Sequence, residues 1–298
     1  MQSFSRGWSF LKQAWEMAFK DKDLLKPSIY ALVAGLIVSV IGIIPLAIGY
    51  FIFGTEGVGG FIMFIMGGIM VFVQFVVAYV FSGMTVYLIY GYLSEGDGRM
   101  DKAWEIVRRD FFDILTLAAA STAVNMLKTA AQRNKKNSMA ASLARSATSL
   151  LETLWTEAAL LVLPAMIIDD LNLKDGMQRV WKITKENLLL VGISTVGVRW
   201  VTGLISFVFG VIGFVIAFAI GGGAAYISGG SAAISIVGVV IGALIFFSFV
   251  MVASVFSSYT NTAYHTCLYI WAREVETAKA HGSSVPVRAP APLAAALA

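Results

Sequence analysis

Four apolar segments, each longer than the hydrocarbon core of a membrane is thick, constrain this sequence more than any other feature. They run over residues 29–53, 61–90, 188–220 and 232–271. A helix of about 20 apolar residues already crosses a bilayer. Charged residues make up only 13% of the 298 residues, against about 25% in soluble domains. The sequence therefore predicts an all-α integral membrane protein.

Two less apolar segments complete a predicted set of six transmembrane helices. Residues 111–127 are rich in Ala, Ser and Thr, and the run from Leu150 to Ile168 is long enough to span a membrane. The six expected spans cover residues 28–53, 61–92, 111–127, 149–169, 188–220 and 232–272, within one membrane domain over 27–277. The last residues, 278–298, are rich in Ala and Pro, which is typical of a disordered tail.

A short charged segment with one tryptophan at a fixed position occurs three times, each time directly before an expected span. The tryptophans are Trp15, Trp104 and Trp181, and the residue six positions later is Asp21, Asp110 or Asn187. This repeat predicts an amphipathic elbow helix that lies at the membrane surface and leads into a span. The first elbow helix, within residues 1–26, also carries Trp8, so we expect Trp8, Trp15, Trp104 and Trp181 to be interfacial anchors. An alternative is that this first helix packs on the protein's own bundle.

The distribution of charge predicts the orientation of the chain. The turns at residues 54–60 and 221–231 contain one charged residue, Glu56, whereas the termini and the elbows hold most of the others. The positive-inside rule then places both termini and all three elbows in the cytoplasm. The basic stretch 128–145 conflicts with this plan, because it would lie outside. Either its hairpin crosses despite the rule, which the length of the fourth span favours, or the third and fourth segments enter the membrane only partway.

Several classes of function have no support in the sequence. There is no nucleotide-binding glycine loop, no Gly-x-Ser-x-Gly nucleophile elbow and no His-Glu-x-x-His metal motif. One cysteine, Cys267, excludes an internal disulfide, and with only two histidines a zinc site is not expected. No basic cluster alternates with aromatic residues as in nucleic-acid-binding proteins. We therefore expect no enzyme activity, no cofactor, no metal and no nucleic acid.

A few polar residues within the expected spans are the candidate functional residues. Glu152 and Glu157 lie in the fourth span, Arg199 in the fifth and Asn125 in the third. A charge inside the bilayer costs about 2.5–3.5 kcal/mol on insertion scales, so it usually faces a partner or water. Glu157 and Arg199 are the deepest carboxylate and cation, and we expect them to pair. The pair is either part of a polar pathway for an ion or a structural contact that fixes helix register.

Small residues form a stripe along the last span. Gly238 and Gly242 make a Gly-x-x-x-Gly motif, and Ser254 and Ser258 continue at four-residue spacing. Such stripes allow close helix approach, either within one chain, which is favoured, or between copies. His265, near the end of this span, is expected to be an interfacial hydrogen-bonding residue.

Several short stretches stand out: the opening from Arg6 to Trp15 followed by Lys22–Leu25, then Leu161–Pro164 followed by Lys174–Trp181, and the exit of the last span from Tyr264 to Glu274. Together they resemble a bacterial family of multi-spanning membrane proteins known only as a domain of unknown function. The resemblance covers about residues 4–276 and implies a six-helix protein of the bacterial cytoplasmic membrane. The basic stretch 128–145 and the Ala/Pro tail depart from the family pattern. The family has no known activity, so no residue role is transferred.

These features predict a non-enzymatic membrane protein that acts by self-assembly or as a partner-binding subunit, in contact with the bilayer and with anionic lipids as candidate contacts. The alternative is a channel or transporter for an ion or small solute. A run of water-accessible positions beside Glu157 and Arg199 would favour transport, whereas a continuous apolar seam of small residues would favour assembly.

Overall fold

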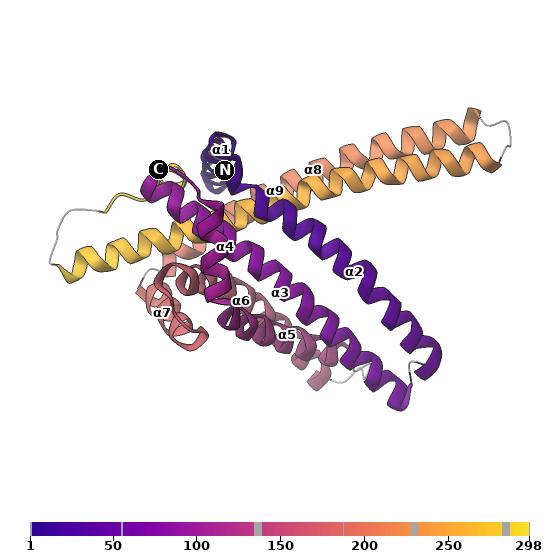
Figure 1. The fold of residues 1–298 in the computed structure, drawn as a ribbon, viewed down its shortest axis with the longest axis horizontal. Helices are drawn as coiled ribbons and strands as arrows, with labels where there is room; N and C mark the ends of the chain where they lie inside the picture. The colour runs from indigo at the N-terminus through magenta and orange to yellow at the C-terminus, as the bar shows by residue number, and fades with distance from the viewer. Residues whose placement is uncertain are drawn as a thin grey trace. The chain divides into compact units, whose positions relative to one another are not determined.

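A computed structural model of the chain describes residues 2–54, 56–133, 139–186, 188–227, 232–281 and 287–297 (Figure 1). All regular structure in these ranges is helical, in the order α1(Gln2–Lys20), η1(Lys22–Leu24), α2(Lys26–Phe53), α3(Gly57–Glu95), α4(Met100–Arg109), α5(Phe111–Arg133), α6(Met139–Asp169), α7(Leu173–Glu186), α8(Leu188–Ile227), α9(Ala232–Ala280) and α10(Ala291–Leu297). Six of these helices are long and apolar enough to cross a membrane: α2, α3, α5, α6, α8 and α9. The predicted all-α membrane architecture is confirmed.

The three elbow helices end where the repeat predicts. α1 ends at Lys20, α4 at Arg109 and α7 at Glu186. Each helix ends one residue before the Asp or Asn that lies six positions after its tryptophan. In the first copy the Asp21 carboxylate accepts hydrogen bonds from the backbone N–H groups of Asp23 (2.9 Å) and Gly98 (2.8 Å). In the second copy the Asp110 carbonyl accepts the N–H of Ile114, so the chain passes directly into α5. In these two copies, the residue six positions after the tryptophan therefore lies at the junction between the elbow helix and the segment that follows it.

The chain divides into two compact units. The hairpin unit comprises Met1–Lys20, Leu189–Tyr264 and Ala291–Ala298, and the bundle unit comprises Asp21–Leu188 and His265–Pro290. The single membrane domain expected over 27–277 is thus shared between both units, because α9 contributes its first part to one and its last part to the other.

In the hairpin unit, α8 and α9 run side by side in opposite directions (Figure 1). Their close approach depends on glycine. A Cβ added to Gly242 would lie 2.7 Å from the carbonyl oxygen of Ala217, and one added to Gly238 would lie 2.1 Å from the Cβ of Ala224. The Gly-x-x-x-Gly motif therefore packs α9 on α8 within one chain, as the sequence favoured.

The apolar face of α1 packs inside the hairpin unit. Trp15 stacks on Phe256 of α9 with ring centroids 4.0 Å apart, and its indole N–H donates to the Thr260 hydroxyl at 3.1 Å. Phe10 meets Tyr264 edge to face. For Trp15 the structure thus shows contact with the protein's own helices, which was the alternative to an interfacial anchor, whereas Trp8 is half exposed.

The C-terminal tail differs from the prediction of disorder over 278–298. α9 continues to Ala280, and Ala291–Leu297 form α10, which packs on α1 with Leu293 fully buried. The prediction was wrong over these residues because it weighed the prolines and not the run of Ala and Leu after them. Ala and Leu have the highest helix propensities, and Pro292 is tolerated in a first helical turn.

The bundle unit begins with the α2–α3 hairpin. Gln74 of α3 donates its side-chain amide to the Gly35 carbonyl (3.1 Å) and to the Ser39 hydroxyl (2.7 Å) of α2. Further along, the side chain of Met70 lies against Gly42. Most other side chains of α2 are exposed, as expected for a helix surrounded by lipid.

The buried core of the bundle unit lies beyond the level at which α2 begins. The Tyr30 ring, at the start of α2, faces Phe81 of α3. The last 14 residues of α3 therefore extend about 21 Å beyond the level of Tyr30. There Val107 of α4 and Ile167 of α6 close on Gly83, where an added Cβ would lie 3.4 and 3.2 Å from them. We call this region the elbow end.

The α5–α6 hairpin runs along α3 in the opposite direction. Ser121 of α5 meets Tyr79, and Met126 meets Gly68, nearer the α2–α3 turn. α5 continues seven residues beyond Met126 to Arg133, about 10 Å, while Gly68 is about 16 Å from Gly57. α5 thus ends within about 6 Å of the level of the turn, which favours full crossing over partial entry.

Candidate functional site: a polar row on α6

Three polar contacts lie close together along one stretch of α6. The first joins the ammonium group of Lys128, on α5, to the Glu152 carboxylate. Both side chains are about three-quarters buried, with 29% and 26% of their surface exposed. An ion pair removed from water to this degree is stable only when both partners remain. Glu152, a predicted candidate, is therefore held by a cation that sequence reasoning did not assign to it.

The second contact centres on the Ser121 hydroxyl of α5. The indole N–H of Trp155 donates to it at 2.8 Å, and the Tyr79 hydroxyl lies 2.7 Å away. Ser121 is buried, and these bonds satisfy it from two other helices. The contact joins α3, α5 and α6 through one hydroxyl group.

The third contact joins Glu157 to His265 of α9. The His265 Nε2 atom lies 3.5 Å from the Glu157 Oε2 atom, and the imidazole is 2% exposed. His265 is thus buried, which corrects the expectation of an interfacial residue. The partner expected from the sequence, Arg199, lies in α8, and its side chain is outside the described residues, so the predicted pair stays a prediction.

The polar row, defined as these three contacts, lies at membrane depth. Glu152 and Glu157 are five residues apart, about 7.5 Å along α6. From Gly57 to Phe81, α3 covers about 36 Å, close to the roughly 30 Å of a hydrocarbon core. Lys128 lies two residues after Met126 on α5, and the Met126 side chain lies against Gly68, near the middle of that stretch of α3. The row therefore runs from about half depth toward the elbow end.

Beyond the row, α6 is apolar and buried over residues 161–167 until Asp169. The Asp169 carboxylate accepts a hydrogen bond from the Tyr269 hydroxyl and pairs with the Arg273 guanidinium at 3.0 Å. Glu276 pairs with Arg179 (2.7 Å) and Lys182 (2.6 Å) of α7. This ionic cluster fastens α6, α7 and α9 at the elbow end, and an apolar block separates it from the polar row. Sequence reasoning missed the cluster because charged residues at helix ends and on a short amphipathic helix are ordinarily exposed.

A second charged group closes the α4–α5 junction. The Arg109 guanidinium donates to Asp110 from Nε (2.6 Å) and Nη2 (3.0 Å) and pairs with Asp170 at 3.1 Å. Burial raises the pKa of the Asp110 carboxyl above its ordinary value, and the hydrogen bonds from Arg109 offset only part of that rise.

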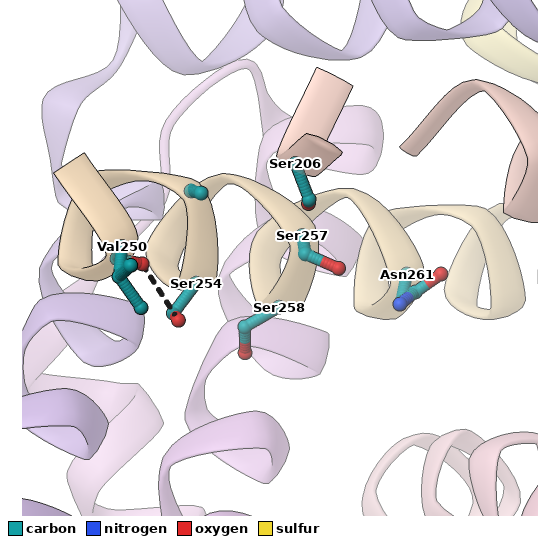
Figure 2. A pocket seen from close by; sticks show the side chains of 7 residues that line it. Ser206, Val250, Ser254, Ser257, Ser258 and Asn261 are labelled. Atoms are coloured by element: carbon teal, nitrogen blue, oxygen red, sulfur yellow. Dashed lines mark hydrogen bonds between the residues drawn. The ribbon is translucent and has the colours of Figure 1, made fainter. Parts of the chain in front are cut away.

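The hairpin unit has an open pocket of about 470 Å³. It is lined by Ser206, Val250, Ala253, Ser254, Ser257, Ser258 and Asn261. Figure 2 shows Ser206 projecting from α8 toward the turn of α9 that carries Ser257. The Ser254 hydroxyl donates to the Val250 carbonyl at 2.9 Å, one turn back on the same helix. Ser254 and Ser258, predicted as packing residues, thus line a hydroxyl-rich surface.

The remaining predicted residues lie apart from the polar row. Asn125 is half-buried on α5, and its backbone carbonyl oxygen accepts a hydrogen bond from the Thr129 hydroxyl. Trp104 and Trp181 are 48% and 72% exposed on their elbow helices, unlike the stacked Trp15. Within the described ranges, no group of His, Cys, Asp and Glu side chains could hold a metal ion.

No protein-family model matches the chain, and no curated protein matches it either. The family resemblance seen in the sequence therefore stays a prediction.

Proposed function

We propose that this multi-pass membrane protein is a non-enzymatic conductor of protons or small cations through its α3–α5–α6 bundle. The observation that carries the proposal is the polar row, in which the half-buried Glu157 beside the buried His265, the Ser121 hydroxyl and the Lys128–Glu152 pair follow one another along α6 within a candidate membrane span. Ionisable groups at this depth are costly, and in membrane proteins they commonly mark ion and proton pathways.

The side chains of the row suit stepwise proton transfer. Carboxylates and a neutral imidazole accept a proton and release it again, and the hydroxyls of Ser121 and Tyr79 donate and accept in the same step. Glu157 and His265 form the end of the row toward the elbow end, and Glu152 forms the end at half depth. Conduction along the row requires bridging waters between the three contacts. Protons are therefore favoured over larger cations.

The proposal places the protein in the bacterial cytoplasmic membrane with both termini and the elbow end on the cytoplasmic side. Support comes from the two turns at residues 54–60 and 221–231, which hold one charged residue between them, and from the basic excess at the termini and elbows. In this orientation the Glu157–His265 pair is nearer the cytoplasm than the Lys128–Glu152 pair.

Proton flux into proteoliposomes tests the proposal. A potassium diffusion potential drives the flux, and a trapped pH-sensitive dye reports it. Wild-type protein should acidify the vesicles faster than protein-free controls, and Glu157→Gln and His265→Gln should each lower the rate at least about tenfold, because each removes a proton-binding step. Asn125→Ala is the matched control, since Asn125 is half-buried on α5 outside the row. A wild-type rate equal to that of empty vesicles would exclude the proposal.

Assembly is a second candidate function, favoured by the hydroxyl-rich pocket on α8 and α9. Ser and Asn side chains on a lipid-exposed surface hydrogen-bond across helices when another helix covers them. Mass measurement in nanodiscs tests this idea with Ser254→Leu and Ser258→Leu, both in the pocket lining. A shift from a larger assembly to the 32.1 kDa monomer would support it, and a wild-type monomer would exclude it.

A further inference from the structure

One side of the elbow helix α7 is fixed by packing on α6. Gly176, Val180 and Ile183 are buried on it. A Cβ added to Gly176 would lie 3.4 Å from Met166 and from Val162 of α6. This contact determines which side of α7 faces away from the protein.

The opposite side of α7 combines lysines with large apolar side chains. Lys174, Met177, Trp181 and Lys185 follow one another at spacings of three and four residues, so they share one face. Trp181 is 72% exposed and Met177 is 37% exposed. All four side chains are exposed, and we call this face the α7 face. A single exposed tryptophan is unremarkable, but one placed between two lysines on an amphipathic helix is typical of membrane-surface helices.

The connectivity of α7 holds this face near a membrane surface. α6, which precedes it, contains a candidate span that ends at Asp169, and α8, which follows it, contains the candidate span Val201–Ala224. The N-terminal end of α7 therefore lies only a few residues beyond the end of a candidate membrane span. Trp and Tyr are enriched at this depth because their rings are amphipathic.

The charges of the α7 face point to a negatively charged partner. Lys182, the remaining lysine of this part of the helix, is turned aside and pairs with Glu276. The face itself carries Lys174 and Lys185 and no acidic residue. The corresponding face of α4 differs, because it carries Asp101 three residues before Trp104 and Arg108 four residues after it, so its two charges balance. The two elbows share an exposed tryptophan but not the basic character.

We infer that the α7 face binds the surface of an anionic phospholipid bilayer, with the Trp181 ring at the boundary between headgroups and acyl chains. Lys174 and Lys185 contact the phosphate groups of lipids such as phosphatidylglycerol. This contact does not depend on proton conduction.

Quenching of tryptophan fluorescence by brominated lipids tests the inference in proteoliposomes of the full-length protein. The Trp181 signal is the difference between wild type and Trp181→Phe, measured with brominated phosphatidylglycerol or brominated phosphatidylcholine at equal mole fraction. We expect severalfold stronger quenching of this signal by the anionic lipid. Each lysine near a membrane surface enriches anionic lipid by roughly fivefold, the equivalent of about 1 kcal/mol.

Charge variants distinguish headgroup binding from simple burial. Lys174→Gln with Lys185→Gln should abolish the preference for phosphatidylglycerol and preserve quenching by phosphatidylcholine. Lys182→Gln, the same charge change on the same helix, should keep the preference, because Lys182 faces Glu276. Equal quenching by both lipids in the wild type would overturn the inference. Absence of quenching by either lipid would also overturn it and would indicate that water or protein covers Trp181.

Discussion

The sequence located Glu157 as an important residue but not its neighbour. A carboxylate within an apolar segment can be recognised from the sequence alone, whereas its partner depends on which helices pack together. His265 is 108 positions away, and no periodicity relates the two residues. The same holds for Glu152 and Lys128, since Lys128 belongs to a basic stretch that indicated only topology. Residue identity was thus predictable and pairing was not.

A double-mutant cycle tests whether Glu157 and His265 stabilise the bundle together. Glu157→Gln and His265→Gln should each destabilise the protein, and the double variant should lose about 1 kcal/mol less than the sum, because only the first change breaks the contact. Unfolding in mixed detergent micelles measures the differences. Glu157→Gln combined with Asn125→Ala is the control and should be additive within about 0.5 kcal/mol. Additive losses in the main cycle would show that the two side chains do not interact.

Equivalent repeat tryptophans should differ in their contribution to stability. Trp15→Ala removes a stacked ring and a hydrogen bond to Thr260, so we expect a loss of at least about 2 kcal/mol. Trp181→Ala removes a ring that is 72% exposed, so its effect in detergent should stay within about 0.5 kcal/mol. Unfolding midpoints in the same detergent compare the two variants. Equal losses would contradict the different environments of the two residues.

At the scale of elements, patterns along the chain were more informative than at the scale of residues. The spacing of tryptophan and Asp or Asn predicted where three elbow helices end, since the turn that follows each is specified locally. The packing surface of the first elbow was not specified locally, because an amphipathic face suits either lipid or protein. The helix in the C-terminal tail was missed for the same reason. Its burial depends on α1, which is far away in the sequence.

Two glycines of the α8–α9 hairpin should respond in opposite ways to alanine. Alanine in a helix interior is favoured over glycine by about 0.5–1 kcal/mol. At Gly210 an added Cβ meets nothing within 4 Å, so Gly210→Ala should be neutral or stabilising. At Gly242 the Cβ would lie 2.7 Å from the Ala217 carbonyl oxygen, so Gly242→Ala must move the helices apart and should destabilise by about 1–3 kcal/mol. Thermal unfolding in detergent measures both variants, and the same sign in both would contradict the close approach.

At the scale of the whole molecule, composition predicted the class, and contact within each unit refined the plan. Six spans follow from apolar length, which the sequence contains directly. The division into two units does not, because α9 is one continuous helix that contributes to both. The antiparallel run of α5 along α3 favours a crossing hairpin although its tip is basic. The orientation of the protein in the membrane is predicted by the distribution of its charged residues, and the contacts between its helices do not test it.

Cysteine labelling in intact bacterial cells tests that orientation. The native Cys267 is buried and should give little background with a membrane-impermeant maleimide. Val58→Cys and Tyr226→Cys, at exposed positions in the two turns that lack basic residues, should be labelled from outside, and Asp97→Cys only after the cells are opened. Leu143→Cys, at an exposed position near the start of α6, decides between the two plans for the basic hairpin. Labelling of Leu143→Cys from outside means that α5 and α6 cross, because only a crossing hairpin presents this end of α6 to the exterior. Protection of Leu143→Cys in intact cells and labelling after lysis would mean that the positive-inside rule holds there and that the hairpin enters only partway.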